Sequence, residues 1–513
     1  MRYGFVIDHN RCIGCHACTV ACKEEHNVPV GVFRTWVKYI EKGEFPNTRR
    51  HFGVLRCNHC DDAPCVEICP TKALYRRADG IIDFDNERCI GCKSCMQACP
   101  YDALYIDPRT NTAAKCNYCA HRVEVGLEPA CVIVCPEQAI IAGDLDDPAS
   151  RINHLVAMEK VSTRKPGKGT RPKLFYLGID EDLLEPTRVE RQNGHLWADK
   201  NPREDFYAFA RDRNNNGDNS HAPASGKARE VYDVSHSRPW GRKIASYLWT
   251  KSIAAGVLLV AALLLELGHH GERALLTLAS PILSLFFLAV TMLLLIIDLK
   301  RPERFYYLLT KPNPNSWVVL GGYILVLYGV LGGSWLLCAI FRARVPGVLI
   351  WPTAILAVGA ACYSAFLFAQ AKGRDLWQSP LLLWHLLIQA LTAGSATLIL
   401  AAVILRSAPV LIDRLESFLA LSLLLSLGMI LGELYLTHVS EDLRRATDLL
   451  KTGALSGSFW GMVVGVGLLL PLVLLAWSGD SPAISGAASV FALAGLWFFE
   501  DLWVRAGQAV PLS

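Results

Sequence analysis

The chain has 513 residues, too many for one ordinary domain, and its 51 Lys and Arg residues nearly balance 47 Asp and Glu residues, for a formal net charge of +4. No basic run is interleaved with aromatic residues, so we expect no nucleic-acid partner. The composition divides the chain in two: a polar, cysteine-rich first part, and long apolar runs from about Leu248 onward.

The first predicted element is a strand at Tyr3–Asp8, and four cysteine blocks follow it. The blocks hold sixteen of the 18 cysteines: Cys12-x2-Cys15-x2-Cys18-x3-Cys22, Cys57-x2-Cys60-x4-Cys65-x3-Cys69, Cys89-x2-Cys92-x2-Cys95-x3-Cys99 and Cys116-x2-Cys119-x11-Cys131-x3-Cys135. This is the bacterial ferredoxin run, with a proline after three of the blocks and insertions in two. We expect strands at Gly80–Phe84 and Ala103–Ile106, on either side of the third block.

Four sets of four thiolates are enough for four [4Fe–4S] clusters, which carry one electron each. The fourth cysteine of such a run ligates the other cluster of a two-cluster unit, so the blocks must act in pairs. Disulfides are the alternative use of an even number of cysteines, but C-x2-C repeats do not favour them. A zinc array also uses C-x2-C pairs, yet it rarely adds a third close cysteine and a Cys-Pro.

Residues 1 to about 200 resemble the iron–sulfur subunit of the dimethyl sulfoxide reductase and polysulfide reductase family. The segment DHNRCIGCHACTVACKEEHNVP carries the resemblance. It implies that the first block pairs with the fourth and the second with the third. The implied ligand sets are Cys12, Cys15, Cys18 and Cys135; Cys116, Cys119, Cys131 and Cys22; Cys57, Cys60, Cys65 and Cys99; and Cys89, Cys92, Cys95 and Cys69.

We expect the cluster domain to cover residues 1–190 and a polar linker to cover 191–244. The segment LFYLGID near the end of the head predicts one more strand. His154, His195, His221 and His236 stand in polar sequence and are interpreted as solvated surface residues. No export leader or twin arginine precedes Cys12, which favours a head that stays in the cytoplasm.

Eight apolar stretches then predict an all-α membrane domain over residues 245–513. They cover about 249–268, 275–297, 317–341, 346–371, 380–405, 415–438, 457–478 and 484–506. Each is long enough to cross a hydrocarbon core. The fold expected is therefore an α+β ferredoxin-like iron–sulfur head, with two paired 2x[4Fe–4S] units, followed by an eight-span transmembrane helix bundle.

Basic residues are distributed unequally over the two ends of these spans. Fourteen Lys and Arg residues flank the spans on the side of the head, among them Lys251, Arg304 and Arg374, against five on the opposite side. This bias predicts a cytoplasmic head on a bacterial inner (cytoplasmic) membrane protein. The alternative is that the extra basic residues hold a partner subunit.

The membrane half resembles the NrfD-type, or polysulfide reductase, membrane subunit. The segments DLKRPERFYYLLTKPNPNSWVVLGGYIL and GRDLWQSPLLLWHLLIQALTAGSA carry the resemblance, and SIAAG adds a weaker match. The resemblance implies eight spans, no haem and electron exchange with a quinone, menaquinone or ubiquinone, near the iron–sulfur face. It also implies a separate large catalytic subunit with a molybdopterin-type centre.

Ionisable residues inside spans are costly, so they are the first candidates for a quinone and proton site. We expect His385 to bind a quinone carbonyl, because histidine donates a hydrogen bond and exchanges a proton near neutral pH. The other candidates near the head are Glu433, Asp298 and Arg304 for proton or quinone chemistry, and Trp384, Tyr435 and His438 for quinone binding; Glu500 and Asp501 lie in the last span.

Several alternatives stay open at this stage. His385 lies about one turn from the membrane edge and suits an interfacial role as well, and Asp298 with Arg304 also fits a structural loop pair. His269 and His270 mark either the mouth of a proton path or a plain polar turn. Cys338 and Cys362 are interpreted as buried small apolar residues.

The sequence therefore predicts an electron-transfer and membrane-anchor subunit that relays electrons between a quinone pool and a separate catalytic subunit. No pterin-binding segment is evident, so we expect no turnover of the partner's substrate by this chain alone. A redox-coupled proton-translocating module, a hydrogenase-linked electron conduit and a passive anchor are the alternative functions.

Overall fold

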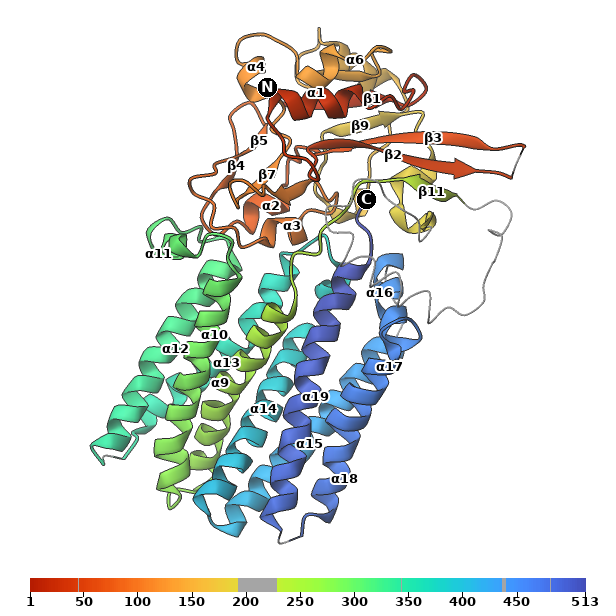
Figure 1. Cartoon of the computed structure of the whole chain (residues 1–513). Helices are drawn as coiled ribbons and strands as arrows, with labels where there is room; N and C mark the ends of the chain where they lie inside the picture. Colours follow the sequence, from red (N-terminus) through yellow and green to blue (C-terminus); the bar gives the residue numbers. More distant parts are fainter. Residues whose placement is uncertain (45, 192–227, 343, 436–439, 480) are drawn as a thin grey trace.

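The computed structural model describes residues 1–44, 46–191, 228–342, 344–435, 440–479 and 481–513. A head of short strands and helices stands on one end of a bundle of long helices (Figure 1). The chain ends at the junction between these two parts (Figure 1). The predicted fold, an iron–sulfur type head followed by a helical membrane domain, is confirmed.

The first sheet of the head forms around β1 (Tyr3–Asp8), the strand predicted at that place. β1 pairs antiparallel with β8 (Ile140–Asp144) and parallel with β9 (Leu174–Leu177). Its central residues Phe5, Val6 and Ile7 are buried on both faces, as in a strand with neighbours on either side. The strand predicted from LFYLGID is thus confirmed as β9.

The second sheet has the order β10-β11-β2-β3. Its strands β2 and β3 extend away from the head as a long two-stranded ribbon (Figure 1). Its strands are β2 (Thr35–Lys42), β3 (Arg49–Arg56), β10 (Glu190–Arg191) and β11 (Arg229–Tyr232). Because β11 pairs with β2, the chain returns to the head just before it enters the membrane half. Most of the predicted linker, residues 192–227, lies outside the described residues, and its boundaries stay a prediction.

Short helices carry the cysteine blocks, and they pack in two pairs. One pair is α1 (Ala17–Glu25) with α5 (Ala130–Ile133), and the other is α2 (Pro64–Glu67) with α3 (Ser94–Ala98). The first block therefore lies with the fourth, and the second with the third.

Two hairpins flank this second pair of helices. They are β4 (Leu74–Arg76) with β5 (Ile82–Phe84), and β6 (Leu104–Ile106) with β7 (Ala113–Lys115). The strands predicted around the third block are confirmed as β5 and β6, each starting one or two residues later than expected. The remaining elements of the head are α4 (Ala120–Val123), α6 (Arg151–Met158), η1 (Pro166–Lys168), α7 (Glu181–Leu184) and η2 (Pro186–Arg188).

Among the described residues, the membrane half contains eight helical segments that are long and apolar enough to span a bilayer. In chain order they are α9 (Arg242–Glu266), η3 with α10 (Ala274–Ala279, Ser280–Asp298), α12 (Trp317–Ile340), α13 (Gly347–Ala369), α14 (Leu382–Leu405), α15 (Pro409–Tyr435), α17 with η6 and α18 (Ser456–Ser458, Phe459–Leu469, Leu470–Trp477) and α19 (Pro482–Ala509). Shorter elements connect them on the side of the head: η4 (Pro302–Arg304), α11 (Tyr307–Thr310), η5 (Asp375–Gln378) and α16 (Glu441–Lys451).

Helix α9 lies at the centre of the bundle and packs against α10, α13, α14 and α19. Small residues permit this close packing: a Cβ atom on Gly256 would overlap the Ala390 carbonyl, and one on Gly394 would overlap the backbone of Gly256. Membrane helices associate through such small-residue contacts because lipid is as apolar as the side chains it replaces. The SIAAG segment thus fixes the crossing of α9 and α14.

Hydrogen bonds and an ion pair join the head to the bundle. Lys93 Nζ lies 2.7 Å from Asp298 Oδ2, and Arg374 Nε donates to Gln97 Oε1 at 2.9 Å. The C-terminal residues are part of the same junction, since Lys38 Nζ donates to the carbonyl oxygen of Ser513 at 3.1 Å. The head is therefore held in one position on the bundle.

Candidate functional site

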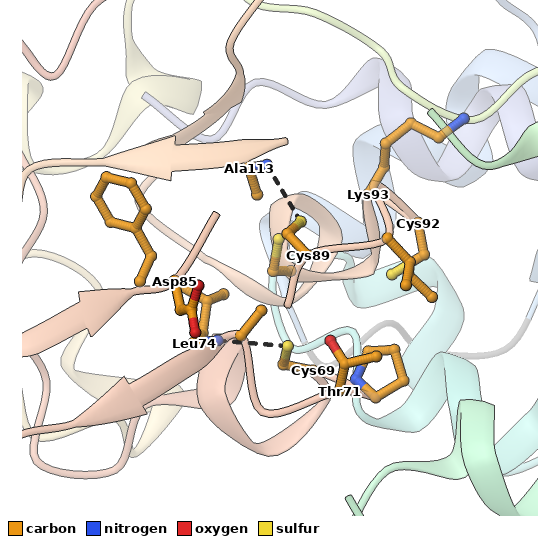
Figure 2. Close-up of a pocket in the computed structure, with 13 residues that line it drawn as sticks. Cys69, Thr71, Leu74, Asp85, Cys89, Cys92, Lys93 and Ala113 are labelled. Carbon is orange, nitrogen blue, oxygen red and sulfur yellow. Dashed lines mark hydrogen bonds between the residues drawn. The ribbon is translucent and has the colours of Figure 1, made fainter. Parts of the chain in front are cut away.

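The cavity nearest the membrane half is lined by four cysteines, Cys69, Cys89, Cys92 and Cys95 (Figure 2). Backbone amides point at two of these sulfurs: Ala113 N–H donates to Cys89 Sγ at 3.4 Å, and Leu74 N–H to Cys69 Sγ at 3.5 Å. Amide donors stabilise negative charge on cluster sulfurs and so tune a cluster's potential. The donor set and the cavity fit a [4Fe–4S] cluster.

A local backbone pattern wraps the third block around this cavity. Gly91 and Lys93 both have positive φ, +69° and 66°, and so reverse the chain between the cysteines. The first block repeats the pattern, with Gly14 at +71° and His16 at 61°. Glycine adopts this conformation without strain, which explains its place in the C-x-G-C loop.

A second cavity of the same kind lies at the far end of the head. It is lined by Cys12, Cys15, Cys18 and Cys135, and Ala139 N–H donates to Cys135 Sγ at 3.2 Å. Cys15 is exposed, whereas Cys18 is buried. The first and fourth blocks, more than a hundred residues apart, thus meet at a solvent-facing cavity.

The other eight cysteines gather in the interior of the head. Burial, and then the charges of Cys116, Cys131 and Cys119, raise the pKa of the Cys22 thiol. Burial likewise raises the pKa of Cys65, with Cys99, Cys57 and Cys60 adding to the effect. Cys22 and Cys65 therefore each lie near the three partners that the resemblance implied, while ligation itself stays a prediction.

Burial also raises the pKa of the Cys92 thiol to about 12, and Cys69 adds to the shift. Four thiolates cannot coexist in such a place without compensating positive charge, which iron ions provide. The described residues include all eighteen cysteines, and none of them forms a disulfide.

Two buried cations precede cysteine blocks, and reasoning from the sequence missed them. Arg56 Nη1 lies 3.0 Å from Cys131 Sγ, and Lys115 Nζ donates to the carbonyl oxygen of Cys116 at 2.8 Å. Both are fully buried. An internal repeat in the sequence could have indicated these two residues: Arg-Cys-Asn-His-Cys at 56–60 and Lys-Cys-Asn-Tyr-Cys at 115–119. These side chains place positive charge beside the cysteines.

Asp298 and Arg304 both contact the head. Asp298 pairs with Lys93, and Arg304 Nη1 donates to the carbonyl oxygens of Asn86 at 2.7 Å and Cys89 at 3.0 Å. Their described contacts therefore join the membrane half to the backbone of the third block. A role in quinone or proton chemistry stays a prediction for both.

His385 and Glu433 come together at the head end of α14 and α15. His385 Nε2 lies 3.1 Å from Glu433 Oε2, although the angles do not form a hydrogen bond. The imidazole stacks on Phe499, with ring centroids 5.9 Å apart. Trp384 and Tyr435 point outward, with exposed fractions of 56% and 59%, and His438 lies outside the described residues.

A cavity runs from His385 between α14, α15, η6 and α19. Its polar wall consists of His385, Gln389, Thr392 and Ser426, and the rest is apolar. Gln389 Oε1 is buried and has no hydrogen-bond partner among the described residues. An apolar slot with a few convergent polar groups is the usual form of a small-molecule site.

Two interpretations of basic and histidine residues were wrong. Lys251, counted among the flanking residues on the side of the head, lies inside α9 and is buried. His236 is not a free surface residue: its Nδ1 lies 2.6 Å from Asp102 Oδ2, and its Nε2 lies 3.3 Å from Asp233 Oδ1. Burial opposes the charge, but the two carboxylates raise the pKa of His236 to about 10.

Comparisons with known proteins match both halves of the chain. The family model described as "Polysulphide reductase, NrfD" matches residues 230–511, and models of a 4Fe-4S dicluster domain match residues 49–145 and 11–74. One subunit of the tetrathionate reductase of Salmonella typhimurium is 46% identical to the head over 202 residues, an alignment that covers 39% of this chain and 80% of that protein.

Two further relatives are similar over the head. One component of the polysulfide reductase of Wolinella succinogenes is 44% identical, with 34% of this chain and 94% of that protein covered. The arsenate respiratory reductase iron-sulfur subunit ArrB of a Shewanella species is 35% identical, with 34% and 96% covered. The chain is thus a multi-pass membrane protein with iron–sulfur clusters, which transfers electrons for, and anchors, an oxidoreductase. It belongs to the NrfD polysulphide reductase family and carries, on the same polypeptide, a 4Fe-4S dicluster unit of the kind found in reductase iron–sulfur subunits.

Proposed function

We propose that this chain relays electrons through four [4Fe–4S] clusters between a membrane quinone and a separate, molybdopterin-type catalytic subunit. One observation carries the proposal: the cysteine-lined cavity of the third block lies directly on the membrane half. Cys89 O accepts a hydrogen bond from Arg304, Cys69 O accepts one from Asn313 Nδ2 at 2.8 Å, and Cys92 O accepts one from Trp240 Nε1 at 3.4 Å.

The proposed ligand sets are those implied by the resemblance, and the cavities and the mutual charge effects of the thiols support them. Each cluster supplies a one-electron redox centre. The protein holds these centres in a row that begins at the membrane and ends at Cys15. Arg56 and Lys115 offset the negative charge of the buried thiolates.

The far end of the row offers a surface to the catalytic subunit. Ile13, which lines the cavity that contains Cys15, is exposed, and so are Val20 on α1 and Ile133 and Val134 just before Cys135. Exposed apolar groups gathered on one face are typical of a protein interface. The relatives are subunits of reductases, which supports a catalytic partner here. We propose that this partner acts on one of formate, sulfite, nitrate, a sulfur compound or an arsenic species.

We place the quinone in the cavity that begins at His385. A quinone carbonyl would accept a hydrogen bond from the imidazole, and Gln389 and Thr392 add polar groups deeper in the slot. Glu433, whose Oε2 lies 3.1 Å from His385 Nε2, would receive the proton of the imidazole. Trp384 and Tyr435 would contact the lipid edge, where amphipathic aromatic residues are enriched. Buried, unsatisfied polar atoms such as Gln389 Oε1 favour a ligand in this position.

We further propose that the head lies on the cytoplasmic side of a bacterial inner membrane. The excess of basic residues on that side supports this orientation. Several of those residues also bind the head, among them Arg304 and Arg374, so part of the excess has a structural cause. Labelling an engineered cysteine on α6 in intact cells and in inverted vesicles tests the orientation: reaction in intact cells with an impermeant reagent contradicts it.

The test of the relay uses the full chain, purified without oxygen and oxidised. Addition of a menaquinol or ubiquinol should bleach the cluster absorbance. His385→Ala should slow bleaching on the order of 100-fold, the usual contribution of a positioned proton-transfer group, whereas His154→Ala on the exposed face of α6 should leave it unchanged. Unaltered cluster spectra after quinol addition to the wild-type chain contradict the proposal. Equal rates in the His385→Ala chain exclude this residue and favour a passive anchor.

A further inference from the structure

Two charged side chains lie in the interior of the helix bundle, away from the residues used so far. Lys251 on α9 and Glu500 on α19 are each 1% exposed. An ionisable group inside a membrane span carries a large desolvation cost, which proteins accept mainly where the group has a function.

Lys251 is well provided with acceptors. Its Nζ donates to the carbonyl oxygen of Ala361 at 2.7 Å and to Ser364 Oγ at 2.9 Å, both on α13. It also lies 5.1 Å from the centre of the Tyr363 ring. Tyr247 OH bonds both Ser364 Oγ and Tyr363 OH. These contacts hold the ammonium group in one position.

Glu500 differs from Lys251 in its hydrogen bonding. Its Oε1 atom is buried and has no hydrogen-bond partner among the described residues. Its charge interacts with that of Lys251 across the gap between α9 and α19. The other titratable groups that face the pair are Tyr247 on α9 and Tyr363 with Cys362 on α13. A buried, unsatisfied carboxyl oxygen beside a fixed cation is suited to take up and release a proton.

Glu500 is next in sequence to a residue that lines the cavity in which we place the quinone. Phe499, the residue before Glu500 on α19, lines that cavity and stacks on His385, and Leu496, one turn earlier on the same helix, lines it too. A proton released in the cavity therefore has an acceptor on the neighbouring face of α19.

We propose that Lys251 and Glu500 form an intramembrane proton-binding site that serves the redox reaction in the His385 cavity. This inference rests on the proposed quinone reaction. When a quinol is oxidised, its two O–H bonds break, two electrons pass to the iron–sulfur clusters and two protons are released. One proton forms the O–H bond of the Glu500 carboxylic acid, and the other passes to the His385–Glu433 pair. Quinone reduction reverses both transfers.

Infrared difference spectroscopy of the full chain tests the site directly. Quinol is added to oxidised protein in H2O and in D2O, while the visible absorbance of the clusters is followed in the same sample. We expect a carboxylic C=O band that appears as the clusters are reduced, moves to lower frequency in D2O, and is lost in Glu500→Gln. Glu416→Gln should retain the band, because Glu416 bonds Ser478 and Ser485 at the other end of the bundle.

Wild-type chain labelled with 13C-glutamate gives a second readout that needs no substitution, since the band must shift with the label. Cluster reduction without a label-sensitive, Glu500-dependent band overturns the proton site and leaves the quinone reaction standing. No cluster reduction by quinol overturns the quinone reaction and the proton site with it.

Discussion

In the head, three of the four cysteines around the membrane-facing cavity come from one short run, Cys89 to Cys95, whereas the residues around the membrane cavity come from separate helices. His385, Glu433 and Phe499 lie on α14, α15 and α19. Local spacing therefore specifies the head site, and helix packing specifies the membrane site. Substitutions in the head and in the membrane half should consequently impair the protein in different ways.

The largest effect should come from a cysteine of the membrane-facing cavity. Cys69→Ser removes one thiolate from the set that adjoins the bundle, and we expect about four fewer irons per chain and loss of quinol-driven bleaching. Iron analysis and stopped-flow absorbance measure the two effects. Cys338→Ser, near the C-terminal end of α12, should keep the full iron content. A Cys69→Ser chain that bleaches at the wild-type rate would place electron entry elsewhere.

A substitution at a helix crossing should damage the membrane half through packing alone. Gly256→Val brings a side chain against the Ala390 carbonyl, where backbone blocks any adjustment. We expect a loss of several kcal/mol of stability, at or above the usual range of about 1–3 kcal/mol for overpacking. Thermal unfolding in detergent measures it. Gly333→Val on α12, where nothing lies within 4 Å of the added Cβ, serves as the control. Equal melting temperatures would refute the close crossing.

The junction between the two parts should depend on pH through His236. Its pKa is raised to about 10, above the ordinary 6.5, because Asp233 and Asp102 stabilise the imidazolium against the cost of burial. The stabilisation is fully present below about pH 6.5 and is lost as the pH rises toward 10, and its size is on the order of 5 kcal/mol. Melting temperatures between pH 6 and pH 10 should therefore fall more steeply for the wild type than for His236→Gln. Parallel curves would show that the ion pairs contribute nothing.

The smallest effect should come from Arg304→Ala. The change removes two hydrogen bonds, to the carbonyl oxygens of Asn86 and Cys89, each contributing about 1 kcal/mol. We expect a melting temperature a few degrees lower and a shifted potential of the nearest cluster, read by a redox titration. Lys311→Ala, which removes only a cation above the Tyr307 ring, should shift neither quantity. An unchanged cluster potential in the Arg304→Ala chain would show that Arg304 does not influence the nearest cluster.

The contrast between local spacing and helix packing also explains which features could be predicted from the sequence. The strand at Tyr3–Asp8 and the eight spans rest on local spacing or on span length, and the described residues contain both at the expected places. The cysteine pairing came from the family resemblance, and ligation by those sets stays a prediction. The pairing of β11 with β2 joins two strands that are far apart in the sequence, and no local pattern predicts it.

The misjudged residues depend on distant partners. Lys251 looked like a flanking residue because the first apolar run was taken to begin near it, whereas α9 starts at Arg242. His236 looked solvated because its partners Asp102 and Asp233 are not both nearby in sequence. Arg56 and Lys115 were visible only as a repeat, and their burial follows from the packing of the cysteine blocks.

The measurement that tests the central claim most directly is metal analysis of the full chain purified without oxygen, combined with quantitative electron paramagnetic resonance after reduction. Four [4Fe–4S] clusters on one polypeptide predict about sixteen irons per chain and spin signals that account for four interacting centres. A chain that holds half that iron or less, or chiefly zinc, would contradict the account.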